Sequence, residues 1–138
     1  SVDDMEYILN KQSGLYGMSG ISVDMRDIEA EALSGGRHAK LAMDVFHYQV
    51  AQYIAKCAVA MGGIDVITFT AGIGERAPIS RKAICDYLKF FGVKIDEKKN
   101  ETRKEEVEIS APDSKIRVFA IPTNEELMIA RETLKLCT

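Results

Sequence analysis

Residues 64–75 are Ile64-Asp65-Val66-Ile67-Thr68-Phe69-Thr70-Ala71-Gly72-Ile73-Gly74-Glu75. The first seven form a β-branched, apolar run of strand length, which predicts a strand that is buried on both faces. Two glycines follow, and a helical pattern then runs from about Ser80 to Phe91. A strand, a glycine turn and a helix in succession are typical of an α/β fold.

Periodic patterns predict three more helices. Apolar residues recur at three- and four-residue intervals from about His38 to Met61, which indicates a long amphipathic helix. A shorter helix is expected from Asp24 to about Leu33, with Ser22 as its cap. The last helix is expected from Asn124 to about Leu136, opened by a capping box of Thr123 and Glu126.

A short helix is expected at Asp3–Asn10, with Asp3 and Glu6 as a possible capping pair. The remaining segments are predicted to be loops and short strands. Small residues between Lys11 and Ser22 indicate a loop in which glycine permits positive φ. Short strands are expected at Val93–Ile95 and Arg117–Ile121, and Pro112-Asp113 has turn composition. The mixed charges from Asp96 to Glu108 indicate a solvated connector or an exposed strand edge.

Composition excludes several classes of protein. The 138 residues are 46% hydrophobic and 28% charged, which fits one ordinary globular domain. Because 18 Lys and Arg stand against 21 Asp and Glu, with no run of five or six like charges, we expect no nucleic-acid partner.

The cysteines and the hydropathy pattern indicate a cytoplasmic protein. Cys57, Cys85 and Cys137 are widely spaced and match neither a disulfide framework nor a metal motif, so we expect a reducing compartment with Cys57 and Cys85 in the core. No basic and apolar leader is evident, and no apolar run approaches the roughly 18 residues that a membrane span needs. We therefore expect no membrane association.

Gly72, Ile73, Gly74 and Glu75 form the first candidate site, because ligands of open α/β sheets bind beyond the carboxyl ends of strands. Glycines there would let backbone N–H groups approach a nucleotide without an intervening Cβ. The alternative is that two glycines merely tighten a strand-to-helix turn. The residues alone leave both interpretations open.

Asp24, Met25 and Arg26 form the second candidate site, in the first turn of a predicted helix. An apolar side chain between a carboxylate and a guanidinium suits a purine, which needs a flat apolar contact and polar groups at its edge. The alternative is an ordinary capped helix start with acidic residues near the positive end of the dipole. Spacing alone favours this alternative.

Glu125 is the third candidate, at the point where a predicted strand meets the last helix. A carboxylate at the end of a strand can hold Mg²⁺ directly or through water. The alternative is a solvent-facing side chain, which the residues alone favour.

Taken together, these motifs resemble those of the acetate kinase family. The resemblance rests on Ser13-Gly14-Leu15-Tyr16-Gly17, Ser19-Gly20-Ile21-Ser22, Asp24-Met25-Arg26-Asp27-Ile28, Phe69-Thr70-Ala71-Gly72-Ile73-Gly74-Glu75 and Ile121-Pro122-Thr123-Asn124-Glu125-Glu126-Leu127. These motifs occur in the family's order and at matching separations. The resemblance covers nearly the whole chain, but only about the final third of a family member.

The resemblance implies the fold and the domain organisation. It implies a partial α/β domain of the sugar kinase, actin and heat-shock ATPase type, which is ribonuclease H-like, with long helices packed on a mixed sheet. Residues 1–138 would form a single C-terminal domain, the second domain of an acetate kinase. Its terminal helix, residues 124–136, would pack on a first domain that this chain lacks.

The resemblance also implies a role for each candidate residue. Asp24, Met25 and Arg26 fall on the family's adenosine contacts. In the family, the glycine turn and the charged residues beside it lie against the nucleotide. The nucleotide contacts that this implies here are Gly72, Ile73, Gly74, Glu75 and Arg76. Many members have Asn at the position of Arg76. Glu125 falls on the glutamate associated with Mg²⁺.

No catalytic residue is expected in the chain. The phosphate-handling hairpin, arginine pair, aspartate and histidine of the family have no counterpart here. His38 and His47, on or beside the long helix, match no catalytic histidine, so we expect both to be structural.

The implied activity is reversible transfer of the γ-phosphoryl group of ATP to acetate, giving ADP and acetyl phosphate, with Mg²⁺ as cofactor. Acetate would be contacted only through the missing N-terminal part, so this chain alone should be nearly inactive. A homodimer is expected. The alternatives are a propionate kinase fragment, and a non-catalytic nucleotide-binding module that self-associates through an exposed apolar helix face containing Leu127, Ala130 and Leu134.

Overall fold

The computed structural model describes residues 1–103 and 105–137 of the chain. It divides into two compact units. One contains Ser1–Gly63 and Ala83–Leu88, and the other contains Ile64–Lys82 and Lys89–Thr138.

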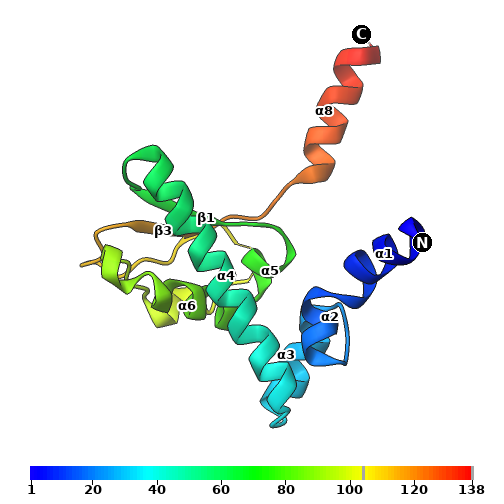
Figure 1. Ribbon diagram of the computed structural model, residues 1–138. Coiled ribbons are helices and arrows are strands. Elements are labelled where there is room, and N and C mark those ends of the chain that lie inside the picture. The colour runs from blue at the N-terminus through cyan, green and yellow to red at the C-terminus, as the bar shows by residue number, and fades with distance from the viewer. Residues whose placement is uncertain (104, 138) are drawn as a thin grey trace. The chain divides into compact units, whose positions relative to one another are not determined.

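The first unit is helical in its described residues. Its N-terminal elements are, in chain order, α1 Val2–Tyr7, the π-helical turn η1 Ile8–Gln12, α2 Gly14–Ser19, α3 Met25–Leu33 and α4 Arg37–Met61. Both α2 and α3 lie against α4 (Figure 1). The long helix that the periodicity predicts is thus confirmed as α4. Its buried face is built mainly from small side chains: Ala39, Ala42, Met43, His47, Ala51 and Ala58.

Most of the predicted loop between Lys11 and Ser22 is helical, so that prediction is wrong. Glycines do take positive φ at the two ends of α2, with φ of 61° at Gly14 and 68° at Gly20. Between them, Leu15 and Met18 are partly buried in a helix that contacts α4. Tertiary packing of these apolar residues therefore overrides the low helix propensity of glycine.

The start of α3 is capped by Asp24 and not, as predicted, by Ser22. The Asp24 carboxylate accepts a hydrogen bond from the backbone N of Arg26 at 2.9 Å. The Ser22 hydroxyl lies one step earlier, where it accepts from the backbone N of Asp24 at 3.0 Å and donates to Asp27 at 2.7 Å. Both residues belong to the cap, but the carboxylate satisfies the helix N–H group.

The second unit contains a mixed three-stranded sheet in the order β1-β3-β2. The strands are β1 Val66–Phe69, β2 Val107–Glu108 and β3 Arg117–Ala120. The pair β1 and β3 is parallel, with Phe69 opposite Ala120, and β2 pairs with β3 in antiparallel orientation. The parallel pair brings the carboxyl ends of β1 and β3 to the same edge (Figure 1).

The prediction that β1 is buried on both faces is wrong for this chain. Burial alternates along the strand: Ile67 and Phe69 are buried, whereas Val66 and Thr68 are exposed. The short strand predicted at Val93–Ile95 is reduced to one bridge, between Ile95 and Ser110.

Short helices connect the strands of the second unit. They are α5 Ala71–Arg76, α6 Pro78–Tyr87, the 3₁₀ turn η2 Lys89–Phe91 and α7 Glu97–Asn100. The helix predicted from Ser80 begins two residues earlier, since proline is well suited to a first helical position. Of the two cysteines predicted to be in the core, Cys85 is buried and Cys57 is exposed.

Arg81 is a fully buried cation in the second unit, with 0% of its surface exposed. Its guanidinium donates to the side-chain oxygen of Asn100 at 2.9 Å and to the backbone carbonyls of Gly74, Asn100 and Thr102 at 2.7, 2.6 and 2.8 Å. The Asn100 amide in turn donates to the Pro78 carbonyl at 2.9 Å. These contacts join the end of α5 to the end of α7 through one side chain.

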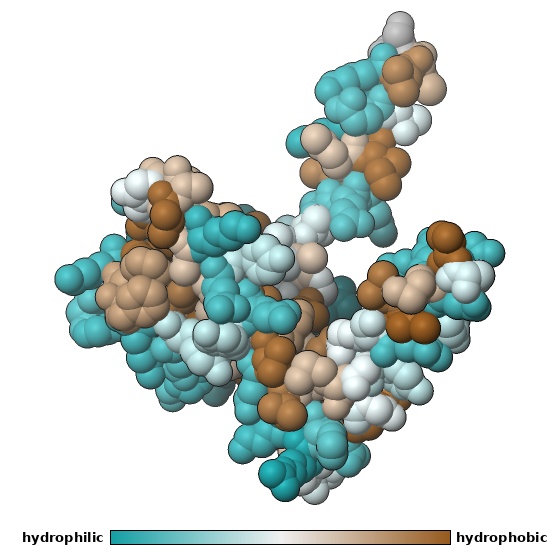
Figure 2. Space-filling model, in the orientation of Figure 1, coloured by the Kyte–Doolittle hydropathy of each residue, from teal (hydrophilic) through white to brown (hydrophobic). Residues whose placement is uncertain are grey.

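The last helix, α8 Glu125–Cys137, has no buried residue among those described. Figure 2 shows hydrophobic side chains on its surface. The large ones that are exposed are Leu127, Met128, Ile129, Leu134 and Leu136. Across the described part of the chain, no helix combines the length and the apolar character that crossing a bilayer requires.

Candidate functional site

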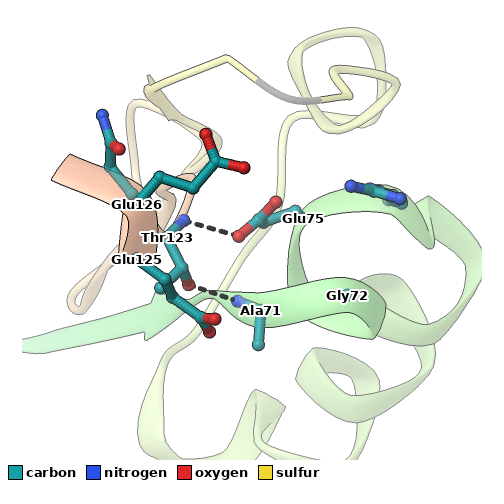
Figure 3. A pocket seen from close by; sticks show the side chains of 8 residues that line it. Ala71, Gly72, Glu75, Thr123, Glu125 and Glu126 are labelled. Carbon is teal, nitrogen blue, oxygen red and sulfur yellow. Dashed lines mark hydrogen bonds between the residues drawn. The ribbon is translucent and has the colours of Figure 1, made fainter. Parts of the chain in front are cut away.

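A hollow of ≈ 360 Å³ lies in the second unit, just beyond the carboxyl ends of β1 and β3 (Figure 3). One wall comes from α5, which follows β1, and the other from the segment that follows β3 and starts α8. The lining residues are Ala71, Gly72, Glu75, Arg76, Thr123, Asn124, Glu125 and Glu126. Four predicted site residues, Gly72, Glu75, Arg76 and Glu125, are therefore brought together.

Thr123 joins the two walls of the hollow. Its side-chain oxygen accepts a hydrogen bond from the backbone N of Ala71 at 3.0 Å and lies 2.5 Å from the hydroxyl oxygen of Thr70. Its backbone N donates to the Glu75 carboxylate at 2.6 Å. Figure 3 shows the contacts with Ala71 and Glu75, which lie near the two ends of the short helix α5. Thr123 is therefore not the capping-box residue that the sequence predicts, and Asn124 instead accepts from the backbone N of Leu127 at 3.1 Å.

The turn out of β1 is strained at a residue that is not glycine. Ala71 has φ of 58°, the only positive φ among the described non-glycine residues. An L-residue in this region costs about 1–2 kcal/mol relative to its usual conformation. Such strain persists only where the surroundings hold it, and the hydrogen bond from Ala71 to Thr123 is one such restraint.

The two glycines of the turn have different structural roles. A Cβ added at Gly74 would lie 3.0 Å from the backbone carbonyl carbon of Phe69, so this glycine allows α5 to pack closely on β1. A Cβ added at Gly72 would have no neighbour within 4 Å, and Gly72 does not need a positive φ. Packing within the chain therefore explains Gly74 but not Gly72. Ile73, between them, is half-buried.

The hollow is acidic. Three carboxylates line it, from Glu75, Glu125 and Glu126, against the one guanidinium of Arg76. The hydrogen bond from the backbone N–H of Thr123 lowers the pKa of Glu75, so this nearly buried carboxylate stays charged at neutral pH. Within residues 1–103 and 105–137, no three His, Cys, Asp or Glu side chains converge as a ready-made metal site.

The second predicted cluster, Asp24, Met25 and Arg26, belongs to the first unit. The Asp24 carboxylate faces the Arg26 guanidinium, with 2.5 Å between its Oδ2 and Nη2, and this pairing lowers the pKa of Asp24 to about 2. Arg26 is exposed, whereas Met25 is only 5% exposed. Met25 therefore packs in the core here and offers little free apolar surface.

The two histidines also lie in the first unit. His38 is exposed, and His47 is buried in α4, where desolvation lowers its pKa. The ring of His47 packs edge-on against Phe46, with 5.8 Å between ring centroids. His47 therefore has the surroundings of a core residue.

Comparison with known proteins identifies the family. The model of the acetokinase family matches residues 1–131. The chain belongs to this family. An acetate kinase of Thermotoga petrophila is 54% identical over 96% of the chain, and one of Carboxydothermus hydrogenoformans is 57% identical over 94%. These alignments cover 34% and 32% of the two relatives, so the chain spans about a third of the length of the acetate kinases it matches.

Solved structures confirm the fold class. The crystal structure of Porphyromonas gingivalis acetate kinase matches all of the chain with a TM-score of 0.91 and 40% identity. A propionate kinase from Francisella tularensis matches 96% of the chain with a TM-score of 0.87 and the same identity. The chain covers 35% and 33% of these two structures. It therefore has part of the sugar kinase, actin and heat-shock ATPase type of fold found in the acetokinase family, including a mixed sheet.

Sequence reasoning missed the residues that hold the hollow of this acetokinase-family chain in shape. The Thr-x-x-Glu pattern from Thr123 to Glu126 fits a capping box, and no local signal indicated that its threonine instead contacts residues about 50 positions earlier. Ala71 had no signal either, because alanine is not expected at positive φ. Parallel pairing of these strands could have suggested that residues 70 and 123 are neighbours, since residue 70 ends one predicted strand and residue 123 lies two residues after the other.

Proposed function

We propose that this chain supplies part of the nucleotide site of a phosphotransferase that moves the γ-phosphoryl group of ATP to acetate, reversibly. The hollow beyond β1 and β3 would contact the nucleotide, and the acyl substrate would be held by segments that the longer acetate kinases have in addition. A propionate kinase remains the nearest alternative, since one of the matching structures is described as such. The proposal includes a cytoplasmic location, which rests on the cysteine and hydropathy patterns, and a homodimer, which rests on the family resemblance.

Gly72 is the observation that carries the proposal. It lies on the wall of the hollow at the end of a parallel strand, where ligands of α/β sheets bind. Neither its backbone angles nor its neighbours in the chain require a glycine. Close approach of a ligand to the backbone does explain the missing side chain.

The acidic residues of the hollow suit a nucleotide that arrives with Mg²⁺. Magnesium in nucleotide sites is usually held by one or two carboxylates together with phosphate oxygens and water, so it does not need a complete cage of protein ligands. Glu125 lines the hollow at the start of α8 and offers a hard oxygen donor of this kind. When bound there, Mg²⁺ would neutralise part of the phosphate charge.

In this proposal, Asp24, Met25 and Arg26 contact the adenosine, while Gly72, Ile73 and Gly74 lie against the nucleotide. The exposed Arg26 is paired in both Nε and Nη2 with Asp24, which orients its guanidinium. The buried position of Met25 limits its role to shaping that surface. Arg76, on the wall of the hollow, would supply a cation near the phosphates.

Gly72→Val should leave the fold intact and weaken ATP binding. The added methyl groups meet no atom of the chain near the Cβ position, but they enter the space that we assign to the ligand. A clash of about 1–3 kcal/mol corresponds to an affinity lower by roughly five- to 150-fold. Calorimetric titration with ATP and Mg²⁺ measures this affinity, and circular dichroism checks the fold.

Two further variants make this test specific. Gly72→Ala, which adds one carbon, should give a smaller loss than valine. Ala130→Val creates the same β-branched side chain by adding two carbons on the exposed surface of α8, and it should bind as tightly as the unchanged chain. Unchanged affinity in a folded Gly72→Val variant would reject the assignment of the hollow to the nucleotide.

The exposed apolar residues of α8 favour a second candidate function, a nucleotide-binding module that associates with itself. Five large hydrophobic side chains on one exposed helix are more than monomeric proteins usually leave in contact with water. We therefore expect this chain to self-associate. Analytical ultracentrifugation checks this expectation, and a monomer that persists at high concentration would contradict it.

A further inference from the structure

Thr123 is the residue through which the two walls of the hollow contact each other. On one side, its hydroxyl reaches Thr70 and the backbone N–H of Ala71, at the entrance to α5. Its own backbone N–H reaches the Glu75 carboxylate, near the end of α5. A single residue after β3 is thus bonded to the first and the fifth residues of the helix that follows β1.

Gly72 and Glu125 both lie close along the chain to these bonds. Gly72 directly follows Ala71, and Glu125 lies two residues after Thr123. Both are therefore within two residues of the hydrogen bond between Ala71 and Thr123. The backbone N of Ile121 also donates to the Phe69 carbonyl at 2.9 Å, and within the described residues no backbone–backbone hydrogen bond continues the ladder beyond it. Beyond the end of the sheet, the contacts of Thr123 connect the two segments that follow β1 and β3.

The strain at Ala71 points to the same restraint. Its φ of 58° is unfavourable for alanine, and its N–H group donates to the Thr123 hydroxyl. Valine has nearly the shape of threonine but no oxygen, so Thr123→Val would remove this acceptor and the contact to Thr70. The exposed Ala71 N–H group can then turn to water, which would let the turn relax without unfolding the sheet.

We infer that Thr123 is a positioning residue that holds Glu125 at a fixed distance from Gly72, so that Mg²⁺ and the nucleotide are bound together. This inference rests on the proposed function and adds to it a residue that acts through its contacts with α5. Glu75 belongs to the same set of contacts, because its carboxylate accepts a hydrogen bond from the Thr123 backbone N (Figure 3). Its role in this arrangement is to hold the wall of the hollow.

The test compares binding of ATP with and without Mg²⁺. A residue that only stabilises the fold should change both affinities alike, whereas a residue that sets the position of Glu125 should change their ratio. In Thr123→Val we expect the preference for Mg·ATP over free ATP to fall about five- to tenfold, the range of one lost hydrogen bond. Thr123→Ser keeps the oxygen and should retain the ratio. Thr133→Val, the same change on exposed α8, is the matched control.

Each outcome bears on a different claim. If the unchanged chain binds neither form of ATP, or binds both equally, the proposed function or the role of Glu125 fails, and this inference fails with it. If the unchanged chain prefers Mg·ATP and a folded Thr123→Val variant keeps that ratio, or loses both affinities equally, the inference alone is overturned. Should Thr123→Val not fold, Thr70→Val decides the question, because it removes the other hydroxyl of the exposed pair. It should lower the ratio by a smaller factor, and an unchanged ratio would overturn the inference.

Discussion

Arg81→Met should destabilise the second unit by about 3 kcal/mol or more, since hydrogen bonds to a charged group contribute about 1.5–3 kcal/mol each. Methionine fills similar space but leaves buried acceptors without their donor, among them the carbonyls of Gly74 and Asn100. Small domains have only about 5–15 kcal/mol of stability, so this is a large fraction. The urea midpoint should fall by about 1–3 M.

Controls separate this effect from the loss of one positive charge. Arg131→Met makes the same change at an exposed position of α8 and should shift the midpoint little. Arg81→Lys keeps the charge but not the planar fork that reaches several acceptors, so it should recover less than half of the loss. Hydrogen exchange of the β1 and β3 amides reports on the second unit directly. A loss below about 1 kcal/mol in Arg81→Met would show that these contacts contribute little.

The sequence predicted the elements whose signal is local and long. The 25-residue helix α4 repeats its apolar residues over about seven turns, and the β-branched run at β1 is bounded by glycines. The parallel pairing of β1 with β3 could not be read from either strand alone, because it depends on contacts about 50 residues apart. Recognition of the family motifs, and not periodicity, supplied the mixed-sheet fold that the structural matches confirm.

Predictions failed where tertiary contacts, and not the local sequence, decide what a residue does. Thr123 has an acceptor oxygen that suits either a helix cap or a strand-end contact, and tertiary structure selects the second. Small residues at the start of the chain suit a loop, but packing on α4 makes them helical. Burial of Met25 follows from which face of α3 meets its neighbours, and this could not be read from three residues of sequence.

Arg81 is another residue whose surroundings could not be predicted from the sequence near it. A lone arginine in an amphipathic helix is usually solvent-exposed, and nothing beside it in the sequence suggests otherwise. Its acceptors, the carbonyls of Asn100 and Thr102, lie about 20 residues away in a segment that sequence alone indicates to be a charged connector. Of the candidate site, the residue types and the strand-end location could be predicted, whereas the contacts that hold them together could not.

The chain alone should bind ATP but form no measurable acetyl phosphate from ATP and acetate. Phosphoryl transfer depends on positioning and on neutralising the charge of the moving group. The hollow offers one guanidinium against three carboxylates, so it adds negative charge around a triphosphate. Mg²⁺ offsets part of that charge, and further cations must come from outside the hollow. Removing one such cationic group can lower turnover by roughly 10³-fold or more.

A coupled assay of acetyl phosphate measures this, first with the chain alone and then after adding the N-terminal remainder of a full-length acetate kinase. Recovery of turnover on mixing, and its loss again with Gly72→Val in the mixture, would assign the nucleotide side of the reaction to this chain. Turnover by the chain alone would mean that the transfer groups lie within these 138 residues after all. ATP binding with no recovery on mixing would favour the self-associating module, because the exposed apolar face of α8 would then serve contacts between copies and not contacts with the N-terminal part of an acetate kinase.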